Sequence, residues 1–192
     1  MASSGLTQLK YKGNTYNIGD CLMLRESNLK ILVCRLLEIM QDGGIPGYEE
    51  WPSIKVQWYY HWSELDLEAL GVKKEDHKFL GDNELFFSDH VETVYIDSIL
   101  GKCDVNSLQE YDNLENMQDE YYFSRTKLIT RENRIEPSFE RWETFCICNK
   151  PMNPNLLTVG CDKWTEWFHP TCEGLKDENI PSLASFICSK CR

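Results

Sequence analysis

Residues 161–172 read Cys-Asp-Lys-Trp-Thr-Glu-Trp-Phe-His-Pro-Thr-Cys, and this stretch decides how the C-terminal part of the chain folds. It follows a Cys146-x-Cys148 pair and precedes a final Cys188-x-x-Cys191 pair. Closely spaced cysteines beside a histidine supply the sulfur and nitrogen donors that tetrahedral zinc prefers. A disulfide framework is the alternative, but the nine cysteines are an odd number and the start of the chain does not resemble a secretion signal. The pattern therefore predicts zinc ligands.

The zinc-binding segment, residues 143–192, is small. A segment of about 50 residues cannot bury a large apolar core, so it needs a further source of stability such as a bound metal. Zinc binding by small domains contributes roughly 10–16 kcal/mol of apparent free energy, which is enough to decide folding. We therefore expect removal of the metal to unfold residues 143–192 and to leave most of the remaining chain folded.

Charged residues and cysteines are distributed unevenly, which indicates two domains. Residues 1–140 contain 14 Lys and Arg against 25 Asp and Glu, whereas residues 141–192 contain 6 of each and six of the nine cysteines. The net charge of −11 argues against strong direct binding to DNA or to an anionic membrane and favours a basic partner. No apolar run is long enough for a transmembrane helix, and 42% hydrophobic with 27% charged residues is typical of globular domains.

The first 140 residues are rich in strand patterns. Short apolar and β-branched runs separated by turn residues are typical of a sheet-rich barrel. The predicted strands cover residues 16–24, 30–40, 54–62, 84–87, 91–96 and 121–129. We also predict a short helix over 63–70, capped by Ser63, and a polar loop over 109–119.

The stretch 161–172 closely resembles a PHD finger. The resemblance rests on the Trp-Phe-His-x-x-Cys core and on a final Cys-x-x-Cys preceded by the apolar Ile187. In that family, seven cysteines and one histidine bind two zinc ions in an interleaved order. The resemblance implies a first site of Cys146, Cys148, His169 and Cys172, and a second site of Cys161, Cys188, Cys191 and the residue at 164.

Position 164 departs from the family pattern because it is Trp, which cannot ligate a metal. Either the three thiolates bind zinc together with a water molecule or a carboxylate such as Asp162, or the second site is weak or empty. We expect altered or weakened coordination at this second site.

Several segments of the first part together resemble a BAH domain. They are Ile-Gly-Asp-Cys at 18–21, Val-Gln-Trp-Tyr-Tyr at 56–60, Glu-Leu-Phe-Phe-Ser-Asp-His at 84–90, Ile-Leu-Gly-Lys-Cys at 99–103 and Tyr-Tyr-Phe at 121–123. The resemblance implies a mainly β fold, with a BAH β-barrel-like domain over 10–140 followed by a small zinc-stapled PHD finger over 143–192. This order resembles the short BAH–PHD chromatin readers of plants and some fungi, which bind trimethylated histone tails.

A methyl-lysine cage is expected on the central strand of the BAH-like part. A trimethyl-lysine is a cation that donates no hydrogen bonds, so proteins select it with a ring of aromatic faces. Strand alternation predicts Trp58, Tyr60 and Trp62 on one face. Burial in the core is the alternative for these rings, and the resemblance favours the cage for Trp58 and Tyr60.

The remaining parts of that site follow from the same resemblance. The family's third ring falls near Leu32, so the cage either takes another ring, from Trp62, Tyr48 or Trp51, or is weaker. Asp89 and His90 match residues that contact the tail beside the methylated lysine.

The PHD-like part carries a second set of expected contacts. In methyl-lysine-binding PHD fingers, the Trp two residues before the histidine, here Trp167, is one wall of a cage. Phe145 and Met152 are expected to line the same cage, Met through its polarizable thioether. Leu156, Leu157 and Thr158 begin the strand, ending at Gly160, that is expected to pair with the histone tail, and Asp162 is expected to receive the tail's arginine or amino terminus.

The resemblance implies a nuclear, non-enzymatic regulator of transcription that binds histone H3 tails. The BAH cage is expected to bind trimethyl-lysine, with lysine twenty-seven favoured, and the PHD finger trimethyl-lysine four or the free amino terminus. Other subunits of chromatin complexes are further candidate partners. The alternatives are a RING-like ubiquitin ligase, which also uses interleaved zinc sites, and a scaffold with degenerate pockets. No phosphate-binding loop or nucleophile motif favours catalysis.

Overall fold

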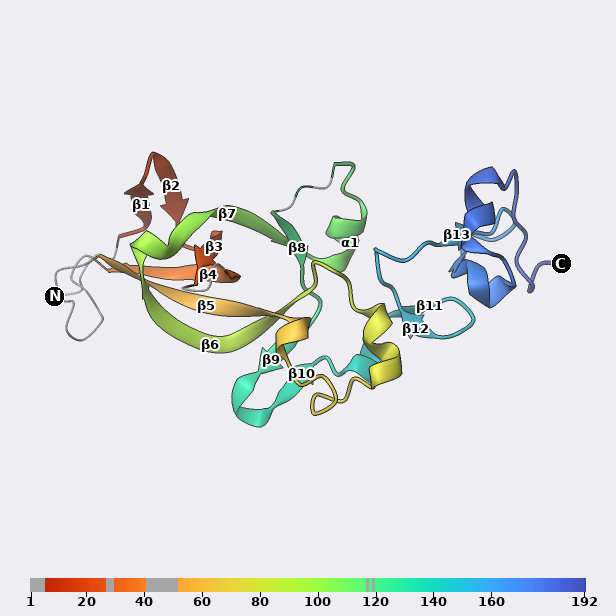
Figure 1. The fold of residues 1–192 in the computed structure, drawn as a ribbon, viewed down its shortest axis with the longest axis horizontal. Coiled ribbons are helices and arrows are strands. Elements are labelled where there is room, and N and C mark those ends of the chain that lie inside the picture. Colours follow the sequence, from red (N-terminus) through yellow and green to blue (C-terminus); the bar gives the residue numbers. More distant parts are fainter. Residues whose placement is uncertain (1–5, 27–29, 41–51, 117, 119) are drawn as a thin grey trace. The chain divides into compact units, whose positions relative to one another are not determined.

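The computed structural model describes residues 6–26, 30–40, 52–116, 118 and 120–192. The chain forms two compact units (Figure 1). Unit 1 comprises residues 1–71 and 83–137, and unit 2 comprises residues 72–82 and 138–192. In the part of the chain that the structure describes, no helix has the length and apolar character needed to cross a bilayer.

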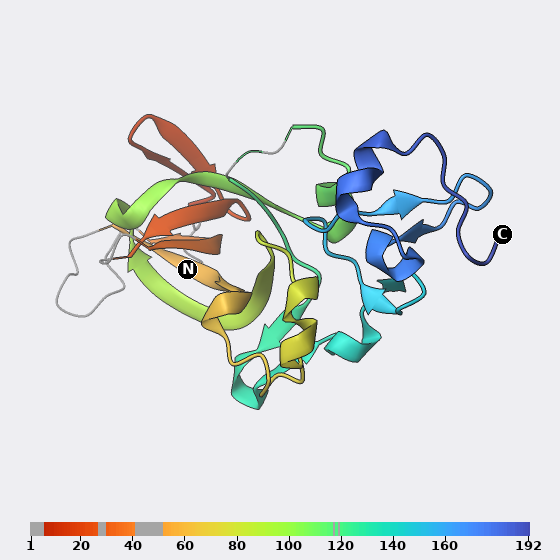
Figure 2. The same ribbon diagram turned by 45° about the vertical axis from the view of Figure 1, so that its right-hand side comes forward.

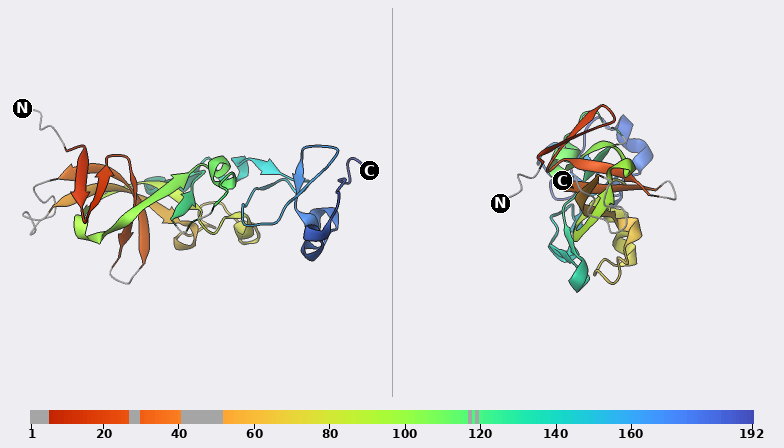
Figure 3. Two further views of the ribbon diagram at one scale, coloured as in Figure 1. Left: turned by 90° about the horizontal axis from the view of Figure 1, so that it is seen from above. Right: turned by 90° about the vertical axis from the view of Figure 1, so that its left-hand side faces the viewer.

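Unit 1 is built on an eight-stranded sheet in the order β10-β9-β6-β5-β4-β3-β7-β8. Neighbouring strands are antiparallel except for the β6–β9 and β7–β8 pairs, which are parallel. A separate hairpin, β1–β2, lies at one end of the unit (Figure 3). The strands are β1 Gln8–Tyr11, β2 Asn14–Asn17, β3 Cys21–Arg25, β4 Ile31–Met40, β5 Ser53–His61, β6 Leu85–Tyr95, β7 Ile99–Asn106, β8 Tyr121–Phe123, β9 Lys127–Ile129 and β10 Arg134–Glu136.

The sheet curls towards a barrel. The long strand β6 bends along its length (Figure 2), and Phe123 of β8 bridges to Glu84, the residue before β6. Edge strand β8 therefore returns to the chain that enters β6. The mainly β, barrel-like fold predicted from the sequence is confirmed, although the two strands predicted at 84–87 and 91–96 are one continuous strand.

Alternation along the central strands gives the sheet two apolar faces. On one face, Cys34 of β4 and Val56 and Trp58 of β5 join a buried cluster with Leu22 and Ile99. On the other face, Val33 and Tyr59 pack with Leu85 and Cys103. Because side chains alternate between faces, neighbouring residues of β5 serve two different surfaces.

Two local predictions for this unit are wrong. Instead of a helix over 63–70, a single 3-10 turn spans Trp62–Glu64, and His61 caps it by accepting a hydrogen bond from the Ser63 N–H at 3.2 Å. The loop predicted over 109–119 overlaps helix α1, Leu108–Asp112. Ser107 and Glu110 start α1 with a capping box, in which each side chain accepts a hydrogen bond from the other residue's backbone N–H.

Unit 2 consists of short elements around a small core. Its strands are β11 Thr144–Phe145, β12 Lys150–Pro151, β13 Val159–Gly160 and β14 Trp167–Phe168, and its 3-10 turns are Lys74–Phe79, Phe139–Arg141, Pro170–Glu173 and Asp177–Ser182. One buried cluster contains Val159, Phe168 and Phe186 together with Cys161 and Cys188. Two of the five buried residues of this cluster are cysteines, so few apolar side chains stabilise the segment around them. Further buried apolar side chains of the unit are Val72, Phe79, Leu80, Phe139 and Trp142.

Residues 72–82 precede β6 in the sequence but pack with the C-terminal segment in unit 2. The buried Asn153 donates two hydrogen bonds, each 2.9 Å long, to the carbonyl groups of Lys78 and Leu80. Lys150 forms an ion pair with the buried Asp76 at 2.5 Å. The compact unit therefore includes a segment that the predicted boundary at 143 leaves out.

Candidate functional site

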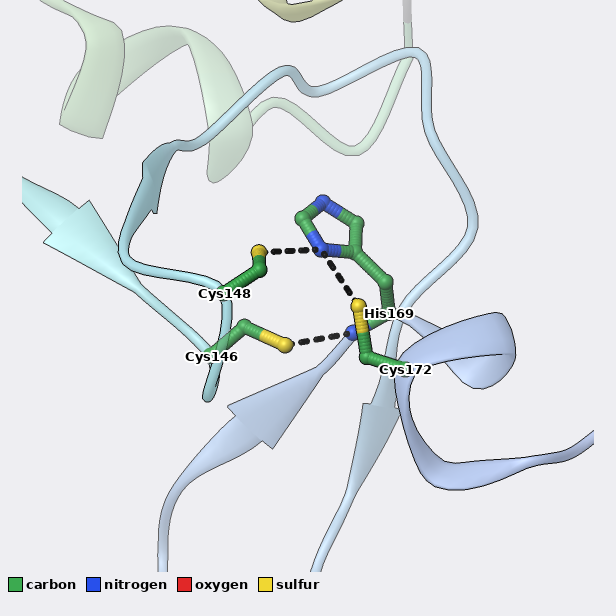
Figure 4. A group of neighbouring side chains, drawn as sticks. All are labelled: Cys146, Cys148, His169 and Cys172. Atoms are coloured by element: carbon green, nitrogen blue, oxygen red, sulfur yellow. Dashed lines mark hydrogen bonds between the residues drawn. The ribbon is translucent and has the colours of Figure 1, made fainter.

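Four predicted metal ligands of unit 2 converge. The Nδ1 atom of His169 lies 3.4 Å from the Cys148 sulfur and 3.9 Å from the Cys172 sulfur (Figure 4). The His169 backbone N–H donates to the Cys146 sulfur at 3.4 Å. All four donor atoms lie within 4.8 Å of one another. Cys146 has a φ of 66°, a left-handed conformation that turns the chain tightly between the first two cysteines.

These donors fit a tetrahedral metal ion. With zinc–sulfur and zinc–nitrogen bonds of ordinary length, ligand atoms at tetrahedral corners lie about 3.5–3.8 Å apart, close to the separations around His169 Nδ1. Burial, and then the charge of Lys78, lowers the pKa of His169, which favours the neutral imidazole that binds metal. The other ring nitrogen, Nε2, is buried and has no hydrogen-bond partner in the described residues, so it is Nδ1 that is presented to the thiols.

Aromatic rings hold this histidine in place. The ring centroid of Phe145 lies 4.6 Å from that of His169, and the centroid of Phe79 lies 5.8 Å from it. No ring contact joins Phe145 to Trp167 among the residues that the structure describes. Phe145, predicted to line a cage, therefore packs against a metal ligand.

A second cluster brings together Cys161, Cys188 and Cys191. The Cys188 backbone N–H donates to the Cys161 sulfur, and this bond, opposed by burial, lowers the pKa of the Cys161 thiol to about 7. The three thiols converge although Trp164 stands in the fourth position, so the expected weakening of this site is not borne out by their arrangement. The Trp164 ring instead lies 5.4 Å from the Lys190 amino group, on the surface.

Asp162 does not join the second cluster. Its carboxylate accepts a hydrogen bond from the Phe186 N–H at 2.7 Å, and its own N–H donates to the Phe186 carbonyl at 2.8 Å. These two bonds hold the segment before Cys188 beside the one after Cys161. The structure thus gives this carboxylate a partner within the fold, in the region where a tail contact was predicted.

Trp167 is the most exposed large apolar side chain of the described residues, with 57% of its surface accessible. It lies on β14 opposite Gly160 of β13, and a Cβ atom at Gly160 would lie 3.5 Å from its ring. The indole therefore rests flat over the two-stranded sheet. In the described residues, β13 pairs only with β14, so its other edge has no strand partner.

The remaining predicted tail contacts border this sheet. The strand expected from Leu156 forms only at Val159–Gly160. Leu156 and Leu157 instead line a cavity of about 430 Å³ with Phe79 and Pro170. Thr158 and Met152 are half-buried.

In unit 1, a bulge in β6 shapes the region of the predicted BAH cage. Gln57 pairs with Val91 and Tyr59 pairs with Phe87, so residues 88–90 lie opposite the single residue Trp58. The Ser88 hydroxyl donates to the Trp58 carbonyl at 2.8 Å, and the Gln57 amide donates to the Ser88 carbonyl at 2.7 Å. Such a bulge turns side chains out of regular alternation, here those of Asp89 and His90.

Trp58 and Tyr60 lie on the same face of β5, as predicted, and each has a polar partner on β6. The Trp58 indole N–H donates to the Glu92 carboxylate at 3.0 Å. The Tyr60 hydroxyl lies 2.6 Å from His90 Nδ1. Burial, and then the charge of Glu92, raises the pKa of Tyr60. Trp58 is 7% exposed within the core, whereas Tyr60 is half-buried at its edge.

The other predicted members of this site lie elsewhere. Strand β5 ends at His61, so Trp62 leaves the alternation and packs its ring 5.1 Å from the His61 ring. Leu32 packs against the same buried cluster as Tyr60. Tyr48 and Trp51 lie outside the described residues. The carboxylate of Asp89 accepts hydrogen bonds from the Thr130 N–H and hydroxyl, at 2.8 and 2.6 Å.

Comparison with known proteins agrees with this arrangement. A family model for the BAH domain matches residues 14–133, and a model for the PHD-finger matches residues 146–191. This chain belongs to the BAH–PHD proteins.

Two relatives resemble this BAH–PHD protein over nearly its whole length. Chromatin remodeling protein SHL of Arabidopsis thaliana is 30% identical over 96% of this chain and 76% of its own. Chromatin remodeling protein EBS of the same plant is 31% identical over 95% of this chain and 73% of its own. The crystal structure of the yeast Rsc2 BAH domain aligns with 69% of this chain and 53% of its own chain, with a TM-score of 0.48 and 14% identity.

Sequence reasoning missed Glu92 of this BAH–PHD protein. One signal could have found it: Glu92 lies within a strand, and its cross-strand partner is the buried Val56. A charged side chain opposite a core residue is uncommon and points to a polar partner or a ligand. Its proximity to Trp58 depends on the three-residue bulge, which no sequence pattern indicated.

Proposed function

We propose that this BAH–PHD protein is a nuclear histone-tail reader. The site around Tyr60 captures a trimethyl-lysine of histone H3, with lysine twenty-seven favoured, and the site around Trp167 captures trimethyl-lysine four or the free amino terminus of the tail. The names of the relatives SHL and EBS as chromatin remodeling proteins support action on chromatin. The protein acts by binding, not by catalysis.

The observation that carries the BAH part of the proposal is the Trp58–Glu92 hydrogen bond beside Tyr60. An aromatic face attracts a quaternary ammonium group with about 0.5–2 kcal/mol, and more when the cation is desolvated. A carboxylate fixed beside the rings adds Coulomb attraction that a neutral ligand does not receive. His90 holds the Tyr60 hydroxyl, so the ring is oriented before the ligand arrives.

The exposed indole of Trp167 supports the PHD part. A large aromatic ring that lies in solvent over Gly160 leaves apolar surface uncovered, which is costly unless a partner uses it. The edge of β13 that has no strand partner would offer backbone hydrogen bonds to an extended tail. Trp167 would form one wall of the second cage, and Met152 is the candidate for another.

Zinc is the metal that the two cysteine clusters fit best. Cys146, Cys148, His169 and Cys172 form a closed set of four ligands, which is typical of structural zinc. Bound zinc would hold β11, β14 and the turn Pro170–Glu173 together at this point, while the thiols Cys161, Cys188 and Cys191 would hold the C-terminal end.

Two sites on one chain increase the apparent affinity for a tail that engages both. Each site alone is expected to bind with a dissociation constant of about 1 μM, equivalent to about −8 kcal/mol. Simultaneous binding raises the apparent affinity only if the geometry allows both sites to be occupied.

Calorimetric titration of histone H3 peptides tests the proposal. The panel has trimethylated and unmodified lysine at position twenty-seven and at position four. We expect Tyr60→Ala to abolish binding of the trimethyl-lysine twenty-seven peptide and to leave binding of the lysine-four peptide unchanged. Tyr60→Phe is the matched control, since it keeps the aromatic face and loses only the hydroxyl. Absence of binding to every methylated peptide, or binding that Tyr60→Ala does not change, would refute the BAH assignment.

A further inference from the structure

Unit 1 contains a cavity on the face of β5 opposite to the proposed cage. Its volume is about 440 Å³, within the range of ligand-binding pockets. Tyr59, Phe87 and Val105 line its apolar part, and Arg35, Arg125 and Lys127 contribute positive charge. Tyr59 points to the face opposite Trp58 and Tyr60, so the two sites use different surfaces of one strand.

Arg35 is the unusual residue of this cavity. Its guanidinium lies over the Phe87 ring, 5.1 Å from the centroid. Its Nε atom is buried without a hydrogen-bond partner, and the side chain forms no ion pair within the described part of the chain. A half-buried guanidinium loses hydration, and this cost is normally offset by an anion or by hydrogen-bond acceptors. In a chain of net charge −11, carboxylates are plentiful, yet none of those that the structure describes pairs with it.

The carboxylates around the cavity are already engaged. Glu136, which lines it, pairs with Arg134 at 3.2 Å. Glu84, which is fully buried, binds Arg125 through two hydrogen bonds of 2.7 Å. Lys127 also forms no ion pair among the described residues, although it lies opposite Glu136 in the ladder. Two cationic side chains, Arg35 and Lys127, are therefore left without a balancing anion.

We propose that this cavity binds an acidic side chain of a protein partner, with its anionic group on Arg35 and Lys127 and its apolar stem on Tyr59 and Phe87. Guanidinium groups bind carboxylate and phosphate through paired hydrogen bonds, and a group stacked on an aromatic ring is already oriented for this. The apolar floor selects an anion that carries a hydrocarbon stem over a bare inorganic anion. The negative net charge of the chain disfavours a polyanion such as nucleic acid.

Titration of the full chain with small probes, followed by two-dimensional NMR, tests this site. The probes are N-acetyl-phosphoserine methylamide, N-acetyl-glutamate methylamide and inorganic phosphate. We expect saturable shifts of amides around the cavity with at least one capped amino acid, and the tighter of the two identifies the anion as phosphate or carboxylate. Inorganic phosphate is expected to bind at least fivefold more weakly than the tighter capped probe.

Substitutions at Arg35 test whether binding of the probes depends on this cavity. Arg35→Gln is expected to weaken binding of the tighter probe at least tenfold. Arg35→Lys should weaken it less, because the ammonium group keeps the positive charge but cannot form the paired hydrogen bonds. Lys55→Gln removes an exposed charge of the neighbouring strand β5 and should leave binding of both capped probes unchanged. Binding of the trimethyl-lysine peptide should be unaffected by Arg35→Gln, since the cage lies on the other face. No saturable binding of either capped probe, equal binding of inorganic phosphate, or unchanged binding by a folded Arg35→Gln variant would overturn the proposal.

Discussion

The Glu92 carboxylate accepts a hydrogen bond from the Trp58 indole N–H at 3.0 Å, across the bulge between β5 and β6. The bond satisfies the only polar atom of a side chain that is 7% exposed, and it fixes a negative charge beside two aromatic rings. One interaction therefore serves both the core and the proposed cage. It also explains why Trp58 can belong to the core without losing its connection to the binding site.

Replacing Trp167 with alanine should separate binding from stability. The side chain is 57% exposed, so we expect a change of less than about 0.5 kcal/mol in the free energy of unfolding. Binding of the trimethyl-lysine-four peptide should fall at least tenfold, as measured by calorimetry. Trp164→Ala is the matched control, because this indole is also exposed, at 43%, and lies on Lys190. Equal losses in the two variants would contradict a specific role for Trp167.

Removal of the metal should unfold all of unit 2. Hydrogen exchange measured by mass spectrometry, with and without a chelator, is expected to show loss of protection in residues 138–192 and also in 72–82. The reason is that Asn153 and Phe79 connect these two segments directly to the ligand region. The strands of unit 1 should keep their protection, and added zinc should restore the protection of unit 2. Protection of 72–82 that persists in the chelated protein would show that this segment does not depend on the metal.

Asn153→Ala tests the connection to residues 72–82 without touching a metal ligand. The side chain is 4% exposed and donates to two carbonyl groups, so its loss leaves both without these bonds. We expect unit 2 to be destabilised by about 1–3 kcal/mol in denaturant unfolding. Asn179→Ala, at an exposed position of the same unit, should change the stability by less than about 0.5 kcal/mol. Similar values for both variants would mean that the two bonds contribute nothing.

Glu84→Gln should destabilise unit 1. Glu84 is fully buried and binds Arg125 through two bonds of 2.7 Å, so the neutral variant leaves a largely buried guanidinium without its counter-charge. Breaking such a pair costs about 3–5 kcal/mol, and the amide oxygen recovers part of this. Glu132→Gln is the surface control. Glu132 also pairs with an arginine, Arg134, but more than half of the Glu132 side chain is exposed. Thermal unfolding that is equally affected by both would contradict the account of this pair.

Local patterns in the sequence predicted the strands and indicated zinc ligands, because both depend on short-range spacing, whereas the grouping of the ligands into sites came from the resemblance to a PHD finger. The alternation of β4 and β5 and the positions of Cys146, Cys148 and His169 follow this rule. Features that depend on distant segments were not predictable in this way. The packing of residues 72–82 in unit 2, the bulge at 88–90 and the partnership of Glu92 with Trp58 all require tertiary contacts.

The errors within short segments have a different origin. The capping box at Ser107 and Glu110 is readable from the sequence, and the polar composition of that stretch concealed it. At the end of β5, His61 is the capping residue where Ser63 was predicted. The turn that follows is a 3-10 turn and does not continue as an α-helix. At α1 the capping box outweighs the polar composition, whereas at 63–70 a serine in the capping position does not suffice to start an α-helix.

The central claim is that the BAH site selects a cation and not merely a bulky side chain. The most direct measurement compares an H3 peptide carrying trimethyl-lysine twenty-seven with the same peptide carrying its uncharged tert-butyl isostere. We expect the cationic peptide to bind at least tenfold tighter, and this difference should shrink in Glu92→Gln but not in the exposed control Glu38→Gln. Equal affinity for the two peptides would contradict the claim.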